Sequence, residues 1–343
     1  MTSLVRIIIA LLALAASAAG ARADPVADFF HGQTISLVVG SDPGGGYDAY
    51  ARPVSRHLGR LIPGNPAIAV KYMPGAASLV AANWLYNSAS RDGLTIGAPQ
   101  RQIPFEPLRG NDAVRYDPFK FLWLGSVTAE TAVFIVTASA PHRDAADLLK
   151  LPLISASLGA GTDSEVESIA MTRLHGAPIK LISGYRGTPE ALLALERGEV
   201  QGVHGISWSY IKTKKADWLK EGKIRVLLQS GLEPHPDLAG TPRLQSLATT
   251  DEDRQVWDLI LAPKVMSRPF VLPPDTLAER VAALRKAFEA LARDPDFLVD
   301  MEKSQLEVSL TTGPQIEALM KRLYAFPAPT IAKMRAAIAT GGR

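Results

Sequence analysis

The sequence predicts an α/β protein, and two observations support this. Short apolar runs alternate with amphipathic segments over almost the whole chain of 343 residues, as in folds that alternate strands and helices. In addition, a strand, a glycine-rich turn and a helix start follow one another at four places. These places are residues 41–47, 74–78, 157–163 and 184–189, one pair in each half of the chain.

The first of these units illustrates the pattern. Ile35–Val39 is a continuous run rich in β-branched residues, as expected of a strand buried on both faces. The turn Ser41–Gly46 follows, and a helix is expected from about Tyr47, because apolar residues then recur at helical spacing. Pro63-Gly64 ends that segment.

The other elements are predicted from the same signals. Strands are expected at residues 67–72, 95–97, 121–125, 133–137, 153–157, 179–182, 200–206 and 224–228. Helices are expected at residues 78–86, from 163, and at 189–197 and 277–291. Thr276 and Glu279 predict a capping box for the last of these helices. Asp251–Asp253 is interpreted as a solvated loop, since the spacing of a calcium loop is absent.

The recurring turns predict anion binding. Each turn directs unpaired backbone N–H groups and the partial positive charge of a helix start towards one point. Such a site binds anions without basic side chains. In open α/β sheets these turns lie at the carboxyl ends of the strands, where ligands bind. The two pairs of turns are therefore expected to face each other across a cleft.

The Gly44–Gly46 turn is the strongest of these signals. It is not a nucleotide phosphate loop, because no Gly-Lys-Ser/Thr follows, and it lacks the G-x-G-x-x-G spacing of dinucleotide-binding turns. A tight turn that needs positive φ is the alternative interpretation. Three consecutive glycines exceed that need and allow a ligand to approach the backbone closely.

The sequence lacks the residue patterns that several kinds of metal binding and catalysis require. The chain has no cysteine, and its six histidines show no metal-binding spacing. Gly205–Ser209 approximates a nucleophile elbow but lacks the final glycine, and the adjacent His204 is poorly placed as a base. We therefore expect neither a metal, nor a cofactor, nor catalysis.

The N-terminus predicts export. Arg6 precedes the apolar run Ile7–Ala19, and Ala21-Arg22-Ala23 is a small-x-small cleavage site, which together describe a signal peptide at residues 1–23. The apolar run is shorter than the ~20 residues of a spanning helix. Cleavage after Ala23 removes two of 37 basic residues and leaves 35 against 34 acids, so the mature charge does not favour nucleic acid.

A few polar and aromatic residues are candidates for the cleft. Asp48 and Arg52 are expected to form an i,i+4 pair at the helix start. Arg101 has two interpretations, a planar clamp for a carboxylate or an ion pair on the surface or between domains. Tyr185, flanked by glycines, is expected to line the cleft, whereas Trp208 belongs either to its wall or to the core.

Taken together, these stretches resemble the substrate-binding proteins of tripartite tricarboxylate transporters, also called the Bug family of periplasmic receptors. The likeness covers nearly the whole mature chain in order. The matching stretches are Ile35–Val39, Pro43–Asp48, Ala51-Arg52, Ile62–Pro66, Met73–Ala76, Ala81–Asn83, Asp92-Gly93, Gly159–Thr162, Gly184–Gly187, Glu196–Val200 and Leu277–Leu291 with Asp294-Pro295.

The resemblance implies a two-lobed flytrap fold. Domain 1 would comprise residues 24–130 and 226–343, and domain 2 residues 131–225, with hinge strands near 125–135 and 224–230. The family holds ligand carboxylates with two turns of domain 1, while domain 2 covers the rest. With Arg101 and Trp208 added, the expected ligand contacts are Asp42, Gly44, Gly45, Gly46, Tyr47, Ala76, Ala77, Ser78, Arg101, Ser157, Gly161, Thr162, Tyr185, Arg186 and Trp208.

Two departures from the family pattern affect the expected ligand. Ala77 and Ser78 stand where the family commonly has glycines, so side chains would intrude and Ser78 would offer a hydroxyl. Gln201 stands where many members have an aspartate, some of which bind an amino group, so an amino-acid ligand is disfavoured.

The resemblance also implies a function. We expect a monomeric periplasmic protein that closes over a small organic carboxylate and docks on the permease subunits of a tripartite tricarboxylate transporter. The alternatives are a receptor that presents its ligand to a signalling partner, and a periplasmic enzyme acting on an organic acid.

Overall fold

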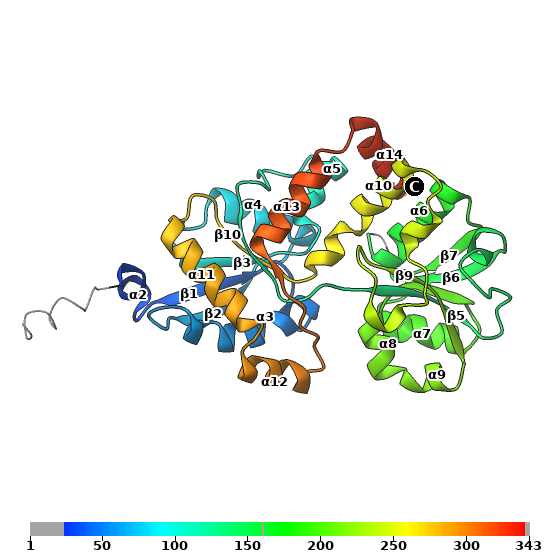
Figure 1. Cartoon of the computed structure of the whole chain (residues 1–343), viewed down its shortest axis with the longest axis horizontal. Helices are drawn as coiled ribbons and strands as arrows, with labels where there is room; N and C mark the ends of the chain where they lie inside the picture. Colours follow the sequence, from blue (N-terminus) through cyan, green and yellow to red (C-terminus); the bar gives the residue numbers. More distant parts are fainter. Residues whose placement is uncertain (1–23, 160, 340–343) are drawn as a thin grey trace, which may run out of the picture.

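The chain folds into two lobes, each built around one β-sheet, in a computed structural model that describes residues 24–159 and 161–339 (Figure 1). The predicted signal peptide lies outside the described residues. In the part that the structure describes, no helix combines the length and the apolar character needed to cross a membrane.

Lobe 1 contains a six-stranded sheet in the order β11-β4-β10-β3-β1-β2. Its strands are β1 (Thr34–Val39), β2 (Ala67–Tyr72), β3 (Thr95–Ala98), β4 (Leu122–Ser126), β10 (Pro269–Leu272) and β11 (Thr311–Thr312). β1 pairs in parallel with β2 and β3, while β10 runs antiparallel to β3 and β4. The carboxyl ends of β1, β2 and β3 therefore lie at one edge of the sheet.

Lobe 2 contains a five-stranded sheet in the order β7-β6-β8-β5-β9. Its strands are β5 (Ala132–Thr137), β6 (Leu153–Ser157), β7 (Ile179–Ser183), β8 (Gly202–Ser207) and β9 (Ile224–Ser230). β6 is parallel to β7 and β8, and β5 is antiparallel to β8 and β9. The predicted strands are thus confirmed, with ends shifted by at most two residues.

Helices surround both sheets. Those of lobe 1 are α2 (Pro25–Phe30), α3 (Gly46–His57), α4 (Leu79–Asn87), α5 (Glu106–Arg109), α11 (Ala278–Leu291), α12 (Pro295–Lys303) and α13 (Gly313–Tyr324). Those of lobe 2 are α6 (Asp163–His175), α7 (Thr188–Glu196), α8 (Trp208–Lys214), α9 (Ala216–Lys220), α10 (Asp251–Leu261) and α14 (Ala328–Ile338). Short 3₁₀ turns complete the chain: η1 (Gly59–Leu61), η2 (Ala76–Ser78), η3 (Ile103–Phe105), η4 (Asp147–Leu149), η5 (Pro236–Leu238), η6 (Leu244–Leu247) and η7 (Ala262–Met266).

Two local predictions about helix starts were wrong. Asp251–Asp253 is not a loop but the first turn of α10, where the Thr250 side chain accepts the Asp253 N–H and the acids suit the helix dipole. The Thr276 capping box is absent, because that hydroxyl donates to the Pro273 carbonyl at 3.0 Å and Leu277 stands at the N-cap.

The domain boundary that was expected at residue 226 does not coincide with the boundary between the two lobes. β9 pairs with β5 along its whole length, so the strand predicted as a hinge at 224–230 is the edge strand of the lobe 2 sheet and does not link the lobes. α10 packs against α14, and α14 packs against α6, which places both late helices with lobe 2 (Figure 1). The physical reason is that α14 packs on α6 and α10 packs on α14, so the three helices share one apolar cluster.

The chain crosses between the lobes at residues 127–131, 262–268 and 325–327. The first two crossovers run antiparallel and are hydrogen-bonded, with Glu130 N donating to Lys264 O at 2.9 Å and Ser267 N to Thr128 O at 3.0 Å. The first coincides with the expected hinge near 125–135, and the second replaces the one expected at 224–230.

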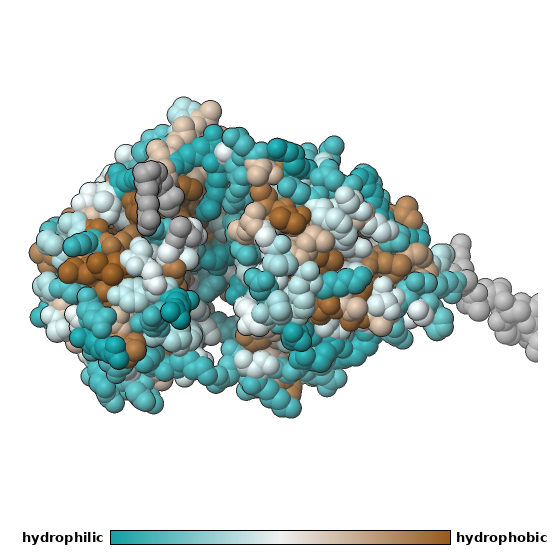
Figure 2. All heavy atoms as spheres, turned by 180° about the vertical axis from the view of Figure 1, so that it is seen from behind, coloured by the Kyte–Doolittle hydropathy of each residue, from teal (hydrophilic) through white to brown (hydrophobic). Residues whose placement is uncertain are grey.

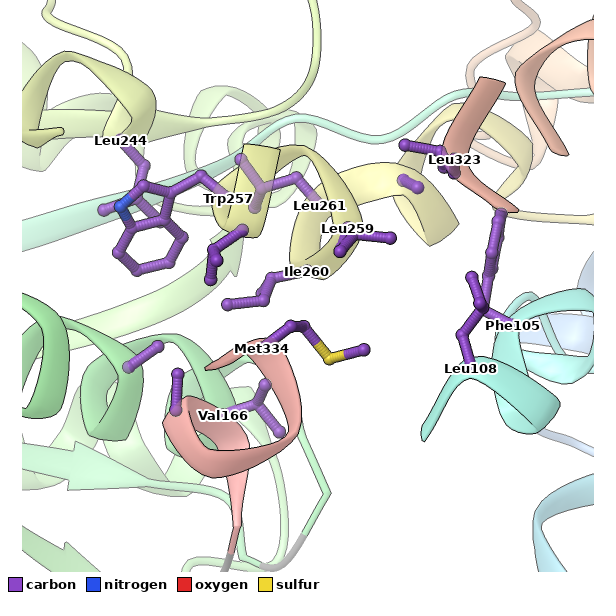
Figure 3. Close-up of a cluster of buried hydrophobic side chains, with 14 of the residues drawn as sticks. Phe105, Leu108, Val166, Leu244, Trp257, Leu259, Ile260, Leu261, Leu323 and Met334 are labelled. Atoms are coloured by element: carbon purple, nitrogen blue, oxygen red, sulfur yellow. The ribbon is translucent and has the colours of Figure 1, made fainter. Parts of the chain in front are cut away.

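One apolar cluster reaches from lobe 2 into lobe 1. Ile260 of α10, Met334 of α14 and Val166 of α6 lie near one another, and Phe105 and Leu108 of lobe 1 belong to the same cluster (Figure 3). Its burial ties the two lobes together on the side of α10 and α14.

Candidate functional site

Two cavities in the cleft between the lobes are lined in part by residues of α3. Figure 2 shows the molecule hollowed between the lobes and hydrophilic residues around the hollow. The first cavity, of about 340 Å³, is lined by Tyr47, Gln100, Arg101, Gln102, Arg109, Glu130, Leu158, Gly161, Thr162, Asp163, Ser164, Val166, Glu167, Gly205, Ile260, Pro263, Lys264 and Arg268. The second, of about 750 Å³, is lined by Gly46, Tyr50, Thr128–Thr131, Ser207–Tyr210, Thr213, Lys214, His235, Pro236, Ser267, Arg268, Ser304–Glu307 and Ser309.

The Gly44–Gly46 turn presents bare backbone at this cleft. Residues 42–46 are exposed, and Gly44 has a φ of +82°, which glycine adopts without strain. α3 begins at Gly46, and its N-cap Gly45 supplies no side-chain acceptor for the first-turn amides. These amides are therefore available to an anion from outside the chain.

Asp48 holds the turn in place. Its buried carboxylate accepts the Gly44 N–H at 2.7 Å, the Tyr72 hydroxyl at 2.6 Å and the Arg52 Nε–H at 2.9 Å, which confirms the predicted pair. Burial alone would raise the pKa of Asp48, but the hydrogen bonds from Tyr72, Gly44 and Arg52 outweigh it and hold that pKa below its ordinary value. Asp48 is thus a charged anchor for the turn.

The second turn is built differently from the expectation. Ala76, Ala77 and Ser78 have φ values of 44°, 51° and 74°, a left-handed conformation that costs an L-residue roughly 1–2 kcal/mol and that glycine would adopt freely. The Ser78 side chain is fully buried, donates to Gly40 O at 2.6 Å and accepts the Gln100 N–H at 3.0 Å. The prediction that Ser78 offers its hydroxyl to the ligand was therefore wrong, because this hydroxyl joins the ends of β1 and β3.

Arg101 forms the interdomain ion pair that was one of its two interpretations. Its guanidinium lies 2.7 Å from Glu130, at the crossover, and 2.7 Å from Asp163 of lobe 2. Its backbone N–H donates to the Tyr47 hydroxyl at 3.0 Å, which fixes it beside α3. Both terminal nitrogens of its guanidinium are paired with carboxylates, so its positive charge is already compensated.

A buried ionic cluster lies behind Arg101. Lys264 Nζ lies 2.5 Å from Asp163 Oδ2 and 2.9 Å from Glu167 Oε1, and both Lys264 and Glu167 are 2% exposed. Ser230 donates to Glu167, and His204 Nε2 lies 3.0 Å from the same carboxylate. The cluster thus ties the crossover residue Lys264 to α6.

The charges of the cluster stabilise one another. Burial would raise the pKa of Asp163, but Arg101 and Lys264 hold it well below its ordinary value. Burial would likewise raise the pKa of Glu167 and lower that of Lys264. Their mutual attraction shifts each pKa the other way, so both groups stay ionised.

The predicted lobe 2 residues take different positions. Gly161 and Thr162 line the first cavity, where Thr162 precedes α6 and its hydroxyl donates to Gly159 O at 2.6 Å. Ser157 is fully buried and accepts the Gly159 N–H at 3.2 Å, so its predicted ligand contact does not fit this arrangement. Tyr185 packs on the lobe 2 core instead of lining either cavity.

The remaining predicted residues divide between the cleft and its surroundings. Trp208 lines the second cavity but belongs to the lobe 2 core, with Nε1 3.2 Å from Asp237. Arg186 is exposed, and its backbone N–H donates to Glu190 at 2.6 Å. Nine of the predicted contacts line neither cavity: Asp42, Gly44, Gly45, Ala76, Ala77, Ser78, Ser157, Tyr185 and Arg186. Gln201 accepts the Ile154 N–H at the start of β6, the end away from the cleft, so it has no bearing on the ligand.

Sequence reasoning missed Arg268, which lines both cavities. Its guanidinium lies over the rings of Tyr47, at 4.6 Å, and Tyr50, at 5.2 Å. Its Nε–H donates to Gly46 O at 3.3 Å, so the side chain lies directly beside the glycine turn. More than 200 residues separate Arg268 from that turn, and no motif marks it.

Within residues 24–159 and 161–339, no group of three or more histidines, aspartates or glutamates is arranged to hold a metal ion.

The fold matches known structures over most of the chain. A TctC solute-binding protein from Polaromonas, determined without ligand, gives a TM-score of 0.68 at 17% identity over 89% of this chain and 98% of that one. Rhodopseudomonas palustris Rpa4515 with adipate gives 0.58 at 19% identity over 89% and 97%. MatC from the same organism, with bound malate, gives 0.56 at 19% identity over 90% and 99%.

Two curated proteins are similar in sequence, whereas no family model matches the chain. A UPF0065 protein from the tcbD-tcbE intergenic region of Pseudomonas sp. strain P51 is 25% identical over 317 residues, covering 88% of this chain and 91% of that protein. A UPF0065 protein from the gbd 5′ region of Cupriavidus necator is 25% identical over 340 residues, covering 96% and 92%.

The two-lobed α/β fold is that of periplasmic solute-binding proteins. Within this class, the chain is similar to the TctC and Bug receptors of tripartite tricarboxylate transporters, to which the UPF0065 proteins also correspond. The resemblance inferred from the sequence is therefore confirmed.

Proposed function

We propose that this protein is an exported solute-binding protein that captures a small organic carboxylate between its lobes. The observation that carries the proposal is the exposed Gly44–Gly46 turn, which opens α3 beside the interlobe cavities without a side-chain cap. The malate and adipate bound to MatC and Rpa4515 support a carboxylate as the ligand class.

The mechanism is capture by closure. The turn binds the carboxylate while the cleft is open, and lobe 2 then closes over the remainder of the ligand. Because the connecting segments 127–131 and 262–268 are joined by only a few backbone hydrogen bonds, small backbone rotations there can move one lobe relative to the other. The moving units are proposed as lobe 1 and lobe 2, with the closed form docking on the permease subunits of a tripartite tricarboxylate transporter.

Titration calorimetry at pH 7 on the protein lacking residues 1–23 tests this function. The panel consists of acetate, malate, adipate, citrate and benzoate, with glucose and lysine as neutral and cationic controls. We expect at least one acid to bind with 1:1 stoichiometry and a Kd of about 1 μM or below, because preformed sites of this kind desolvate most of a small ligand. Failure of every acid to bind would contradict the proposal.

A further inference from the structure

We propose that Arg268 is the specificity residue of the cleft, and that it grips the ligand carboxylate directly and rejects the corresponding neutral amide. The inference rests on the proposed function, because it assigns a partner to the ligand of the same cleft.

Arg268 is fixed in place with its donors towards the cleft. Its backbone N–H donates to Ser126 Oγ at 3.0 Å, and one guanidinium N–H donates to Ser267 O at 2.7 Å. The flat face of the guanidinium lies against Tyr47 and Tyr50, an arrangement favourable to arginine. The residue is therefore held rigidly at the boundary of the two cavities.

The guanidinium retains unused hydrogen-bonding capacity. It has five N–H donors, of which one contacts Gly46 O and one contacts Ser267 O. The other three, on the two terminal nitrogens, have no acceptor among the residues that the structure describes. Donors on both terminal nitrogens form the fork that matches the two oxygens of a carboxylate.

Arg268 differs in this respect from the other basic residues of the first cavity. Arg101 has two carboxylate partners, Lys264 has two, and Arg109 lies 3.7 Å from Glu106. Arg268 has no carboxylate within 4.0 Å in the described part of the chain. The positive charge left uncompensated at the first cavity thus lies beside the Gly44–Gly46 turn.

Gly46 provides the room that this arrangement needs. A Cβ placed on Gly46 would lie 3.0 Å from a terminal nitrogen of Arg268, so a side chain there would push the guanidinium away from the turn. The guanidinium thus lies against the first residue of α3, within the reach of a carboxylate that binds the first-turn amides. A carboxylate accepts from both, whereas the NH₂ group of an amide would face donors and leave them unpaired.

The test compares each acid that the wild type binds in the panel above with its primary amide. We expect Arg268→Gln to raise the Kd of the acid about 10- to 100-fold, the loss typical of a hydrogen bond to a charged group. The preference for acid over amide should fall by a similar factor. Arg268→Lys keeps the positive charge but not the planar pair of donors. Its Kd for the acid should therefore lie between those of Arg268→Gln and the wild type.

Arg280→Gln is the matched control. Arg280 also stacks on an aromatic ring, that of Phe29 at 3.4 Å, and donates to a backbone carbonyl, that of Asp92, away from the cleft. The Arg280→Gln variant should therefore bind the acid with a Kd within about twofold of the wild-type value. If the wild type binds an acid and Arg268→Gln binds it equally well with the same preference over the amide, the assignment to Arg268 is overturned while the proposed function stands. Absence of binding to wild type would refute both.

Discussion

Replacing Lys264 with methionine is expected to lower the free energy of unfolding by about 3–5 kcal/mol, the usual cost of removing one partner from a buried ion pair. Lys264 is 2% exposed and lies within 3 Å of two carboxylates, so its loss leaves Asp163 and Glu167 without their shared cation. Urea unfolding followed by tryptophan fluorescence measures the effect.

The pH dependence of this variant identifies the cause. In the wild type the pKa of Glu167 is held low, so its contribution to stability is complete above its ordinary pKa and is lost as the pH falls through the lowered value. Without Lys264, burial raises that pKa, and protonation then relieves the unpaired charge. The deficit of Lys264→Met should therefore be larger at pH 8 than at pH 5.

Lys212→Met is the control for this experiment. Lys212 also contacts two carboxylates, Asp237 at 2.8 Å and Glu307 at 3.3 Å, but its side chain is 32% exposed. Water screens such a pair, so the cost should be at most about 1 kcal/mol. A cost for Lys264→Met no greater than that for Lys212→Met would show that the buried cluster does not stabilise the fold.

Replacing Asp48 with alanine is expected to weaken ligand binding about tenfold and to cost about 1–3 kcal/mol of stability, because the partners of a buried carboxylate lose their acceptor. Asp48 accepts from Gly44 and Tyr72 and so fixes the backbone that meets the ligand. Calorimetry with the tightest-binding acid of the panel measures the change in Kd, and urea unfolding measures the change in the free energy of unfolding.

Two variants separate the anchor from the exposed ion pair. Asp48→Asn keeps one acceptor oxygen, so its affinity and stability should lie between those of Asp48→Ala and the wild type. Arg52→Ala removes only the exposed partner, whose side chain is 54% exposed, and should change affinity little. Equal losses in Arg52→Ala and Asp48→Ala would mean that the ion pair, not the held turn, supports binding.

The sequence predicted the strands well because they are short apolar runs, several of them bounded by glycine or proline, as β1 and β6 illustrate. It also predicted the turn at Gly44–Gly46, because three consecutive glycines exceed what a tight turn needs. It failed at Asp251 because an acidic cluster suits a loop and a helix start equally well. The late helices were misplaced because their partner, α6, lies far away in the sequence.

The ionic parts of the site were harder to foresee. Lys264 stands alone in the apolar run 259–266, and a buried lysine requires a partner, so a signal existed. Arg268 gave none, since only the folded chain places it against Gly46. Ser78 was misjudged because sequence alone does not reveal that its hydroxyl points back to Gly40.

A crystal structure of the protein with the tightest-binding acid of the panel would show which groups hold the ligand carboxylate. We expect a closed cleft, with one carboxylate within about 2.7–3.2 Å of the backbone amides at the start of α3 and of the Arg268 guanidinium. An acid bound outside the interlobe cleft, or bound there with its carboxylate away from both the turn and Arg268, would contradict it.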